Sequence, residues 1–208
     1  MKVAVVLKSG GDYNRSHVEK IKTMVENYVP HENFICFTDT VEESYDIPLV
    51  DDWPGWWSKM ELFKIRGPLL FLDLDTIITG NINQIIKKIK KEDFVILGDL
   101  IDYERSRKEG WLQSSLLYWS GDASYIYNSF KEDCRAIPAF LRPMHRLRSD
   151  QDYIMEVIRE YGMWQDFSSA IVSFREGISS GKLYDEDKHK IIIFHGSPRP
   201  WEQDVIPY

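Results

Sequence analysis

The stretch Phe71-Leu72-Asp73-Leu74-Asp75-Thr76-Ile77-Ile78-Thr79-Gly80-Asn81-Ile82 decides how the rest of the chain is interpreted. Residues 69–72 are all apolar, which is typical of a fully buried strand. The strand ends in two aspartates spaced i, i+2, and alternate side chains of a strand point to the same face. Two carboxylates on one face repel each other, and a divalent cation that prefers oxygen ligands, such as Mg²⁺ or Mn²⁺, removes that repulsion. The alternative is a polar strand end with one solvated and one capping aspartate, but so apolar a strand argues against an edge position.

Composition excludes several classes of protein. The 208 residues are 43% hydrophobic, which is enough for a sizeable core. We see no repeat, low-complexity tract or linker, so we expect a single domain over 1–208. There are 26 Lys and Arg against 33 Asp and Glu, a net charge of −7. This charge argues against nucleic-acid binding, which needs clustered basic residues.

Features that would direct the chain to a membrane or to export are not visible in the sequence. We see no signal peptide and no apolar run that approaches the length of a membrane span. The two cysteines, Cys36 and Cys134, do not have metal-binding spacing. We therefore expect a soluble, cytoplasmic protein with free thiols and no membrane span.

Apolar strand-length runs alternate with helical patterns, which predicts an α/β fold with a mostly parallel sheet flanked by helices. Expected strands are residues 2–8, 34–37, 69–72, 94–97, 112–119 and 190–194. Expected helices are residues 16–28, with a capping box of Ser16 and Glu19, and residues 56–65, 82–91, 121–130 and 150–161. In such folds ligands bind beyond the carboxyl ends of the strands. The polar side chains that follow predicted strands are Asp12, Asp39, Asp73, Asp75 and His195, and we expect several of them to converge there.

Three further motifs follow a recognisable order around the Asp-Leu-Asp stretch. They are Trp57-Ser58-Lys59-Met60-Glu61-Leu62-Phe63, Ser149-Asp150-Gln151-Asp152-Tyr153-Ile154 and His195-Gly196-Ser197-Pro198-Arg199-Pro200-Trp201. The four motifs together cover nearly the whole chain, and the chain resembles the metal-dependent family 8 of GT-A type glycosyltransferases, which includes glycogenin and bacterial lipooligosaccharide galactosyltransferases. It departs from the family in the last motif, where Gly196 directly follows His195 and Arg199 takes the place of a lysine.

The resemblance implies a GT-A, Rossmann-like fold and a function. The chain would move a hexose from UDP-glucose or UDP-galactose to an acceptor that the sequence does not identify, with retention of configuration. By the same resemblance Asp73, Asp75 and His195 would ligate the metal, with Leu74 lying between the two aspartates in the donor site. An imidazole ligand favours Mn²⁺, with Mg²⁺ as the alternative. For His195 the competing interpretation is a histidine at a strand end that bonds to backbone.

Other positions would bind the donor. Lys59 and Arg199 would contact phosphate, and Gly196 would let the backbone approach it closely. Alternatively, Lys59 is a solvated helix lysine and Arg199 a surface cation between prolines. The family also places a base-stacking aromatic at Tyr13, for which an exposed loop tyrosine is the alternative. Asp39 could accept a hydrogen bond from the uracil N–H.

The helix after Ser149 would support the reacting sugar. Gln151 begins the stripe Gln151, Ile154, Ile158, Tyr161, so it should point into the cleft, and Asp152 is expected to contact the sugar. Asp150 and Asp152 could equally be acids that a helix N-terminus favours. For Trp53, Trp56 and Trp57 we expect core packing rather than a sugar platform.

Two other functions compete. A haloacid-dehalogenase-type phosphatase would use Asp73 as nucleophile and Asp75 as acid/base, but it needs a later Gly-Asp-x-x-x-Asp motif. The stretch at 98–102 is one residue too short for that motif. The other is a non-catalytic nucleotide-sugar binding module, against which the complete metal set argues.

Overall fold

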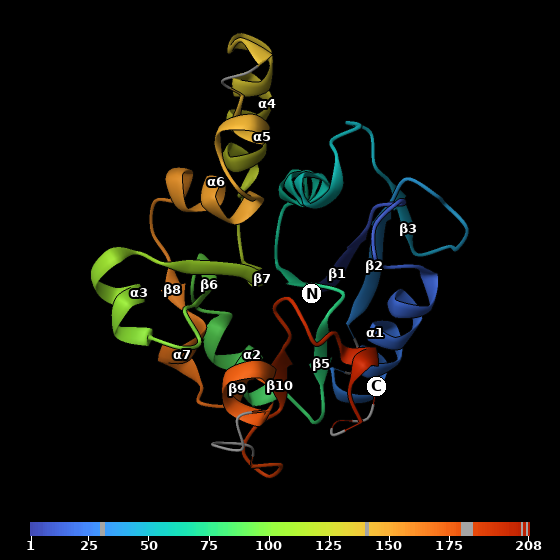
Figure 1. The fold of residues 1–208 in the computed structure, drawn as a ribbon, viewed down its shortest axis with the longest axis vertical. Coiled ribbons are helices and arrows are strands. Elements are labelled where there is room, and N and C mark those ends of the chain that lie inside the picture. Colours follow the sequence, from blue (N-terminus) through green and yellow to red (C-terminus); the bar gives the residue numbers. More distant parts are fainter. Residues whose placement is uncertain (30–31, 140–141, 180–184, 205, 207) are drawn as a thin grey trace.

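The structure, a computed structural model, describes residues 1–29, 32–139, 142–179, 185–204, 206 and 208. Within these residues the strands form two sheets, a seven-stranded sheet in the order β3-β2-β1-β4-β7-β6-β8 and a three-stranded sheet in the order β5-β10-β9 (Figure 1). The strands are β1 (Lys2–Leu7), β2 (Asn33–Thr38), β3 (Asp46–Pro48), β4 (Leu69–Leu72), β5 (Thr76–Ile78), β6 (Phe94–Gly98), β7 (Leu112–Trp119), β8 (Gly162–Met163), β9 (Ile171–Ser173) and β10 (Ile191–Ile193).

Helices lie around these sheets (Figure 1). The α-helices are α1 (Arg15–Tyr28), α2 (Asn83–Ile89), α3 (Tyr103–Glu109), α4 (Ser124–Ala136), α5 (Pro143–Arg146), α6 (Asp150–Val157) and α7 (Trp164–Phe167). Three helical segments have other geometries: the 3₁₀ helices η1 (Gly55–Lys64) and η4 (Pro200–Glu202), and the π-helix η3 (Phe174–Ser179).

The large sheet is mostly parallel, as the sequence predicted. β1 pairs in parallel with β2 and β4, and the pairs β2–β3 and β6–β8 are also parallel. β7 is the exception, since it runs antiparallel to both β4 and β6. The start of β7 therefore lies at the same edge of the sheet as the carboxyl end of β4, where Asp73 follows.

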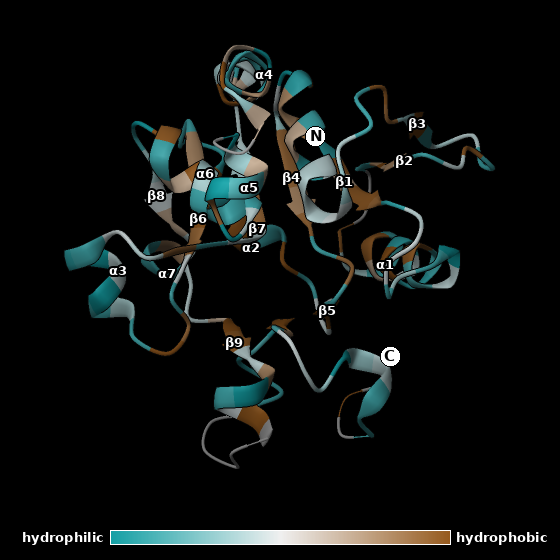
Figure 2. Ribbon diagram, turned by 45° about the horizontal axis from the view of Figure 1, so that its top comes forward, coloured by the Kyte–Doolittle hydropathy of each residue, from teal (hydrophilic) through white to brown (hydrophobic). Residues whose placement is uncertain are grey.

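Each face of the large sheet is covered by its own hydrophobic core. Alternate residues of β1 belong to different cores, with Val3 and Val5 in one and Ala4 in the other. The first core is closed by α1 and α2, and the second by η1, α4 and α6. Figure 2 shows hydrophobic strands at the centre and hydrophilic stretches on the helices around them. The apolar run of β4, entirely buried, is part of both cores.

Three helices differ from their predicted form. The segment expected as a helix at 56–65 is the 3₁₀ helix η1. α4 begins later than predicted, at Ser124, because the Asp122 side chain accepts the backbone N–H of Ser124. α6 is shorter than predicted, since it ends at Val157 rather than residue 161.

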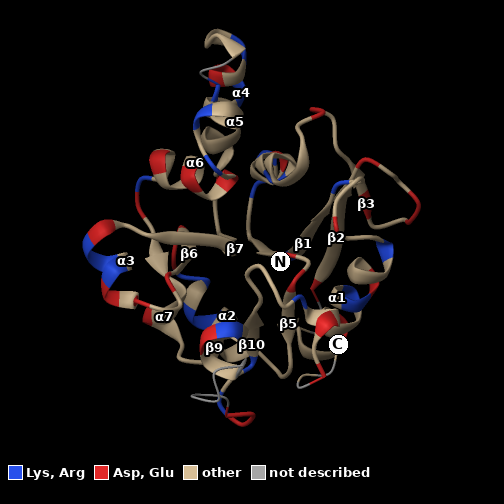
Figure 3. Ribbon diagram, in the orientation of Figure 1, with Lys and Arg blue, Asp and Glu red and all other residues tan. Residues whose placement is uncertain are grey.

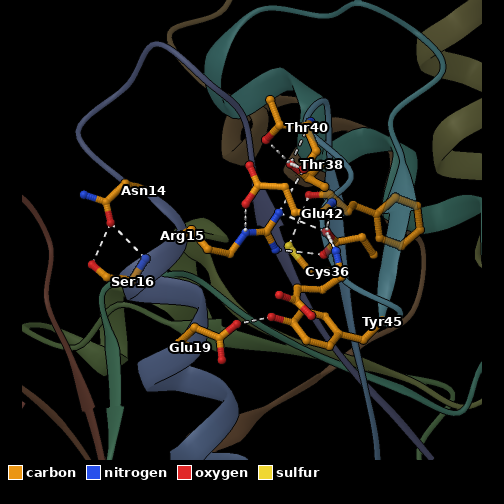
Figure 4. A network of polar contacts seen from close by, with 12 residues as sticks. Asn14, Arg15, Ser16, Glu19, Cys36, Thr38, Thr40, Glu42 and Tyr45 are labelled. Carbon is orange, nitrogen blue, oxygen red and sulfur yellow. Dashed lines mark hydrogen bonds and ion pairs between the residues drawn. The ribbon is translucent and has the colours of Figure 1, made fainter.

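The predicted cap of α1 is wrong by two residues. Asn14 is the N-cap, and its side chain accepts the backbone N–H of Ser16, while Nδ1 of His17 accepts the N–H of Asn14. Glu19 instead accepts a hydrogen bond from the Tyr45 hydroxyl (Figure 4). In the same network Arg15 pairs with both oxygens of Asp46 at 2.8 and 2.9 Å, which fixes the start of α1 to the β2–β3 connection.

The small sheet places the segment that follows β10 close to the aspartate motif. β10 pairs antiparallel with β5, with Ile193 opposite Thr76. A third apolar cluster, which includes Ile77, Phe174 and Phe194, holds this sheet together. The segment 195–201 therefore begins beside Asp75.

Charged residues of both signs are distributed over the helices (Figure 3). Lys87 and Lys88 lie in the last turn of α2, whose three isoleucines are buried, so the lysines form the solvated face of an amphipathic helix. In the described part of the chain no helix is both long and apolar enough to cross a membrane.

Candidate active site

A cavity of about 660 Å³ lies beyond the carboxyl ends of β1 and β4. Its walls come from the β1–α1 loop, η1, the turn at residues 73–75, the start of β7, the start of α6 and Arg199. The predicted convergence is confirmed for Asp12, Asp73 and Asp75, which all line the cavity. Asp39 and His195 are not among the lining residues.

Lys59 carries the central positive charge of the cavity. η1 buries it among Trp57, Met60 and Phe63, so its side chain is only 7% exposed. Its Nζ lies 3.1 Å from Asp73 Oδ1, 3.1 Å from Asp150 Oδ2 and 3.1 Å from Ser114 Oγ. Lys59 is thus a buried ion-pair residue rather than a solvated helix lysine.

Burial and neighbouring charges shift the pKa values of the residues in this cluster. Burial works to lower the pKa of Lys59, but Asp150 and Asp73 more than offset it, so the pKa is raised and the ammonium stays charged. Burial raises the pKa of Asp73, and the attraction of Lys59 only partly opposes it. Because this carboxylate is so costly to hold as an anion, it is suited to gaining a cation.

Asp75 is held by two groups from distant parts of the chain. Its Oδ2 accepts the Tyr13 hydroxyl at 2.8 Å and Nη1 of Arg199 at 2.8 Å. Arg199 also pairs with Asp12 at 3.2 Å. Burial raises the pKa of Asp75, while Tyr13 and Arg199 act to lower it. The interpretation of Arg199 as a surface cation between two prolines is therefore wrong.

Tyr13 is half-buried rather than fully exposed. The guanidinium of Arg199 lies 5.2 Å from its ring centroid, and Trp201 meets the ring edge-on at 5.7 Å. Tyr13 lines the cavity, as a base-stacking residue must, and the stacking itself stays a prediction.

His195 is turned to a neighbour outside the cavity. Its Nε2 shares a hydrogen bond of 2.6 Å with the Ser173 hydroxyl. Burial lowers the pKa of His195, so the imidazole is neutral at pH 7, which is the form that ligates metal. Gly196 has φ +80, a left-handed conformation that favours glycine, and a Cβ there would meet Arg175 at 2.6 Å.

The start of α6 positions the predicted sugar contacts on two sides. Gln151 lines the cavity as predicted, although the apolar stripe of its helix ends before Tyr161, which lies beyond α6. Asp152 does not line this cavity. Its Oδ2 accepts the backbone N–H groups of Arg148 and Ser149, and it forms the capping box with Ser149. The capping role that the sequence left open for Asp152 is thus observed.

Asp39 contacts two residues of the cavity wall, Lys8 and Ser9. Ser9 donates its backbone N–H and its hydroxyl to the carboxylate, and Lys8 pairs with it at 3.1 Å. Burial works to raise the pKa of Asp39, but the Ser9 and Lys8 contacts lower it to about 2. In this structure the carboxylate organises the β1–α1 loop, and its contact with uracil stays a prediction.

Several residues line the cavity that the sequence analysis did not assign to the site. Asp150 is 4% exposed, and it joins α6 to the cluster through Lys59 and Ser114. The polar run 113–115 at the start of an otherwise apolar strand was the available signal for Ser114. Trp56 is 58% exposed and lines the cavity, so the expectation of core packing is wrong for it, although it is confirmed for Trp53 and Trp57.

The residues fit a divalent cation in part. Asp73 and Asp75, with Leu74 between them, face one cavity and have pKa values raised by burial, so a cation there would relieve unfavourable charge. His195 bonds to Ser173 instead. Among the described residues no group of three or more His, Cys, Asp or Glu side chains is arranged to hold a metal ion.

Comparisons with known proteins bear on the fold. No protein-family model and no curated protein matches the sequence. Among solved structures, the glycosyltransferase GlyE of Streptococcus pneumoniae TIGR4 superposes with a TM-score of 0.69 at 12% identity, over 99% of this chain and 57% of GlyE. This chain thus spans little more than half the length of GlyE.

Two further structures are similar over nearly their whole length. The galactosyltransferase LgtC, described in complex with donor and acceptor sugar analogues, gives a TM-score of 0.62 at 10% identity over 98% of this chain and 90% of LgtC. A glycosyltransferase involved in glycosylation of the major capsid of PBCV-1 gives 0.54 at 12% identity, over 93% of each chain. The chain therefore has the GT-A glycosyltransferase fold that its four motifs predicted.

Proposed function

We propose that this chain is a family 8 glycosyltransferase, acting in the cytoplasm as one domain over 1–208. It would transfer a hexose from UDP-glucose or UDP-galactose to an acceptor, with retention of configuration and with Mn²⁺ or Mg²⁺ as cofactor. The observation that supports this most is the pair Asp73 and Asp75 facing a cavity that also contains the cations Lys59 and Arg199. All three structures compared above are glycosyltransferases.

A transferred hexose leaves a diphosphate, so the reaction needs positive charge in the cavity. The bond between the anomeric carbon and the diphosphate oxygen breaks, and its electron pair stays on UDP. The anomeric carbon bonds to the acceptor hydroxyl oxygen, whose proton passes to the departing diphosphate. A divalent cation held by Asp73 and Asp75, with His195 as the third predicted ligand, would supply positive charge at the diphosphate.

Arg199, Lys59 and Gln151 each have a separate role in the proposed reaction. Arg199 offers a planar guanidinium that can exchange its carboxylate partners for phosphate oxygens in a bidentate geometry. Lys59 stays with Asp73 and Asp150 and fixes the position of the aspartate motif. Gln151 lies at the end of the cavity formed by α6, where it would orient the reacting sugar.

Calorimetric titration of UDP with and without Mn²⁺ tests the metal assignment. We expect Mn²⁺ to strengthen binding in the wild type and Asp75→Ala to remove most of that gain. Asp187→Ala is the matched control, because Asp187 is exposed and is not among the residues that line the cavity. UDP affinity that does not respond to Mn²⁺ or to Asp75→Ala would show that the metal assignment is wrong.

A turnover assay distinguishes the proposed transferase from a phosphatase and from a non-catalytic binding module. We expect slow hydrolysis of UDP-glucose or UDP-galactose without acceptor, followed by nuclear magnetic resonance. Gln151→Ala should lower the turnover while leaving UDP affinity nearly intact, because the amide would act on the sugar and the transition state. Hydrolysis of simple phosphate esters but not of nucleotide sugars would support a phosphatase. Binding of UDP-sugar without any turnover would support a non-catalytic module.

A further inference from the structure

A second cavity of about 650 Å³ lies beside the proposed donor cavity. It is formed by the end of α3, the start of β7 and the segment from α5 through α6, which Figure 1 shows close together. Cavities of this size are typical of small-molecule sites. None of the sequence motifs accounts for it, apart from Asp152 in its wall.

The two cavities meet at the first turn of α6. Arg148 lines both of them. Asp150 and Gln151 face the donor cavity, and Asp152, the next residue, faces the second one. A ligand in the second cavity would therefore lie next to the position proposed for the donor's sugar, which is where a transferase must hold its other substrate.

The chemistry of the second cavity suits a carbohydrate. Trp111 and Tyr161 contribute partly exposed aromatic surface, and the apolar face of a sugar ring packs on such surface. The carboxylates of Glu109 and Glu156 offer acceptors for sugar hydroxyls. Aromatic and polar groups mixed in one concave site are the usual arrangement for binding a polar small molecule with a defined orientation.

The charges of this cavity are already organised in the free protein. Arg146 pairs with Glu156 through two hydrogen bonds of 3.0 and 2.7 Å. Arg105 stacks on the Trp111 ring with its guanidinium 4.0 Å from the centroid, which holds the indole in place. The guanidinium of Arg148 makes no hydrogen bond or ion pair within the part of the chain that the structure describes, so it is available to a ligand at the junction.

We propose that this second cavity binds the acceptor, and that the acceptor is a saccharide. The inference rests on the proposed transferase function and goes beyond it by assigning the acceptor's chemical class and location. Trp111 and Tyr161 would hold the acceptor's sugar ring, and Arg148 would stand where acceptor and donor meet.

The test measures acceptor binding and donor use separately. A printed array of defined oligosaccharides is probed with the fluorescently labelled wild-type protein and with the variants Trp111→Ala and Tyr161→Ala. Ile101→Ala is the control, because Ile101 is 64% exposed and lies outside both cavities. UDP affinity and donor hydrolysis are measured for every variant.

We expect the wild type and Ile101→Ala to bind the same glycans, and each aromatic variant to lose about tenfold or more in affinity, as is typical of a buried aromatic anchor. UDP affinity and donor hydrolysis should be unchanged in all variants. Wild-type protein that binds no glycan, or aromatic variants that bind as well as the wild type, would overturn the proposal. A wild type that neither binds UDP nor hydrolyses the donor would instead overturn the transferase function.

Discussion

The ammonium group of Lys59 is the one cation within ion-pair distance of both Asp73 and Asp150 among the described residues. Lys59→Met keeps most of the length of the side chain and removes its charge, which leaves the buried carboxylate of Asp150 and the partly exposed carboxylate of Asp73 without the cation they share. Loss of one partner from a buried ion pair destabilises proteins by about 3–5 kcal/mol, so we expect a decrease of that order in the free energy of unfolding. Urea unfolding measures it.

Lys131→Met is the matched control for this change. Lys131 pairs with Asp51 at 2.8 Å, but its side chain is 27% exposed, so its loss should lower the free energy of unfolding far less than the loss of Lys59. If Lys59→Met and Lys131→Met lowered the free energy of unfolding equally, the structural role assigned to the buried Lys59 would be wrong.

His17 gives the stability a dependence on pH. Burial lowers the pKa of His17, and its Nδ1 accepts the N–H of Asn14 only when the ring nitrogen is unprotonated. The unfolded chain therefore binds a proton at its ordinary pKa of about 6.5, before the folded chain does. The contribution of His17 to stability is complete above about pH 6.5 and decreases as the pH falls toward the lowered folded pKa.

His17→Gln should reduce this pH dependence. Glutamine can accept the same backbone N–H in a capping box but does not titrate. We expect unfolding midpoints measured between about pH 5 and 7 to vary less in the variant than in the wild type. The remaining slope comes from other groups: His189 and His195, whose pKa values burial lowers, add to it, and Asp73 and Asp75, whose pKa values burial raises, act in the opposite direction. Identical slopes would contradict the assignment to His17.

At the scale of elements, α6 depends on its cap. The Ser149 hydroxyl accepts the N–H of Asp152, and the Asp152 carboxylate accepts the N–H of Ser149. Ser149→Ala should lower the free energy of unfolding by about 0.5–2 kcal/mol, the usual effect of losing an N-cap. It should also lower donor turnover, since α6 carries Asp150 and Gln151. Ser124→Ala is the control, because the side chain of Ser124 does not cap α4. Circular dichroism and the turnover assay check both.

Elements set by local sequence were predictable. The apolar run of β4 and the buried strand β1 each depend on residues close in the chain, and both are confirmed. Elements that depend on partners distant in the chain could not be predicted from the sequence. β5 is a three-residue strand that exists because β10 pairs with it, and β7 is antiparallel because of its neighbours rather than its own sequence.

The same distinction applies to the candidate site. Asp73 and Asp75 were identified because their spacing carries a geometric meaning within one strand end. Asp150 was ambiguous, because a helix N-terminus favours any acid and only the tertiary structure places Lys59 and Ser114 against this one. The cap of α1 was mispredicted because Ser16 and Asn14 are both good caps, and the path of the loop decides between them.

At the scale of the whole molecule, the two cysteines test whether residues 1–208 unfold as one unit. Cys36 lies in the core on one face of the large sheet and Cys134 in the core on the other. Burial raises the pKa of the Cys36 thiol to about 12 and raises that of Cys134 as well, so both thiols resist reaction until the protein opens.

Thiol labelling at about pH 8 in the single-cysteine variants Cys36→Ala and Cys134→Ala measures each opening. We expect both opening free energies to equal the global free energy of unfolding from urea. A much smaller value for Cys134 would show that α4 opens on its own as a separate unit.

The order of translation limits when this protein can act. Asp75 meets Arg199 across 124 residues of sequence. At about 5–20 residues per second, the ribosome takes roughly 6–25 s to add those residues. During that interval the nascent chain carries its aspartate pair without the guanidinium that holds Asp75 in the finished fold. A ribosome-bound polypeptide stalled before residue 199 is therefore expected to remain inert toward a donor, and activity begins only after the late strand β10 has emerged and paired with β5.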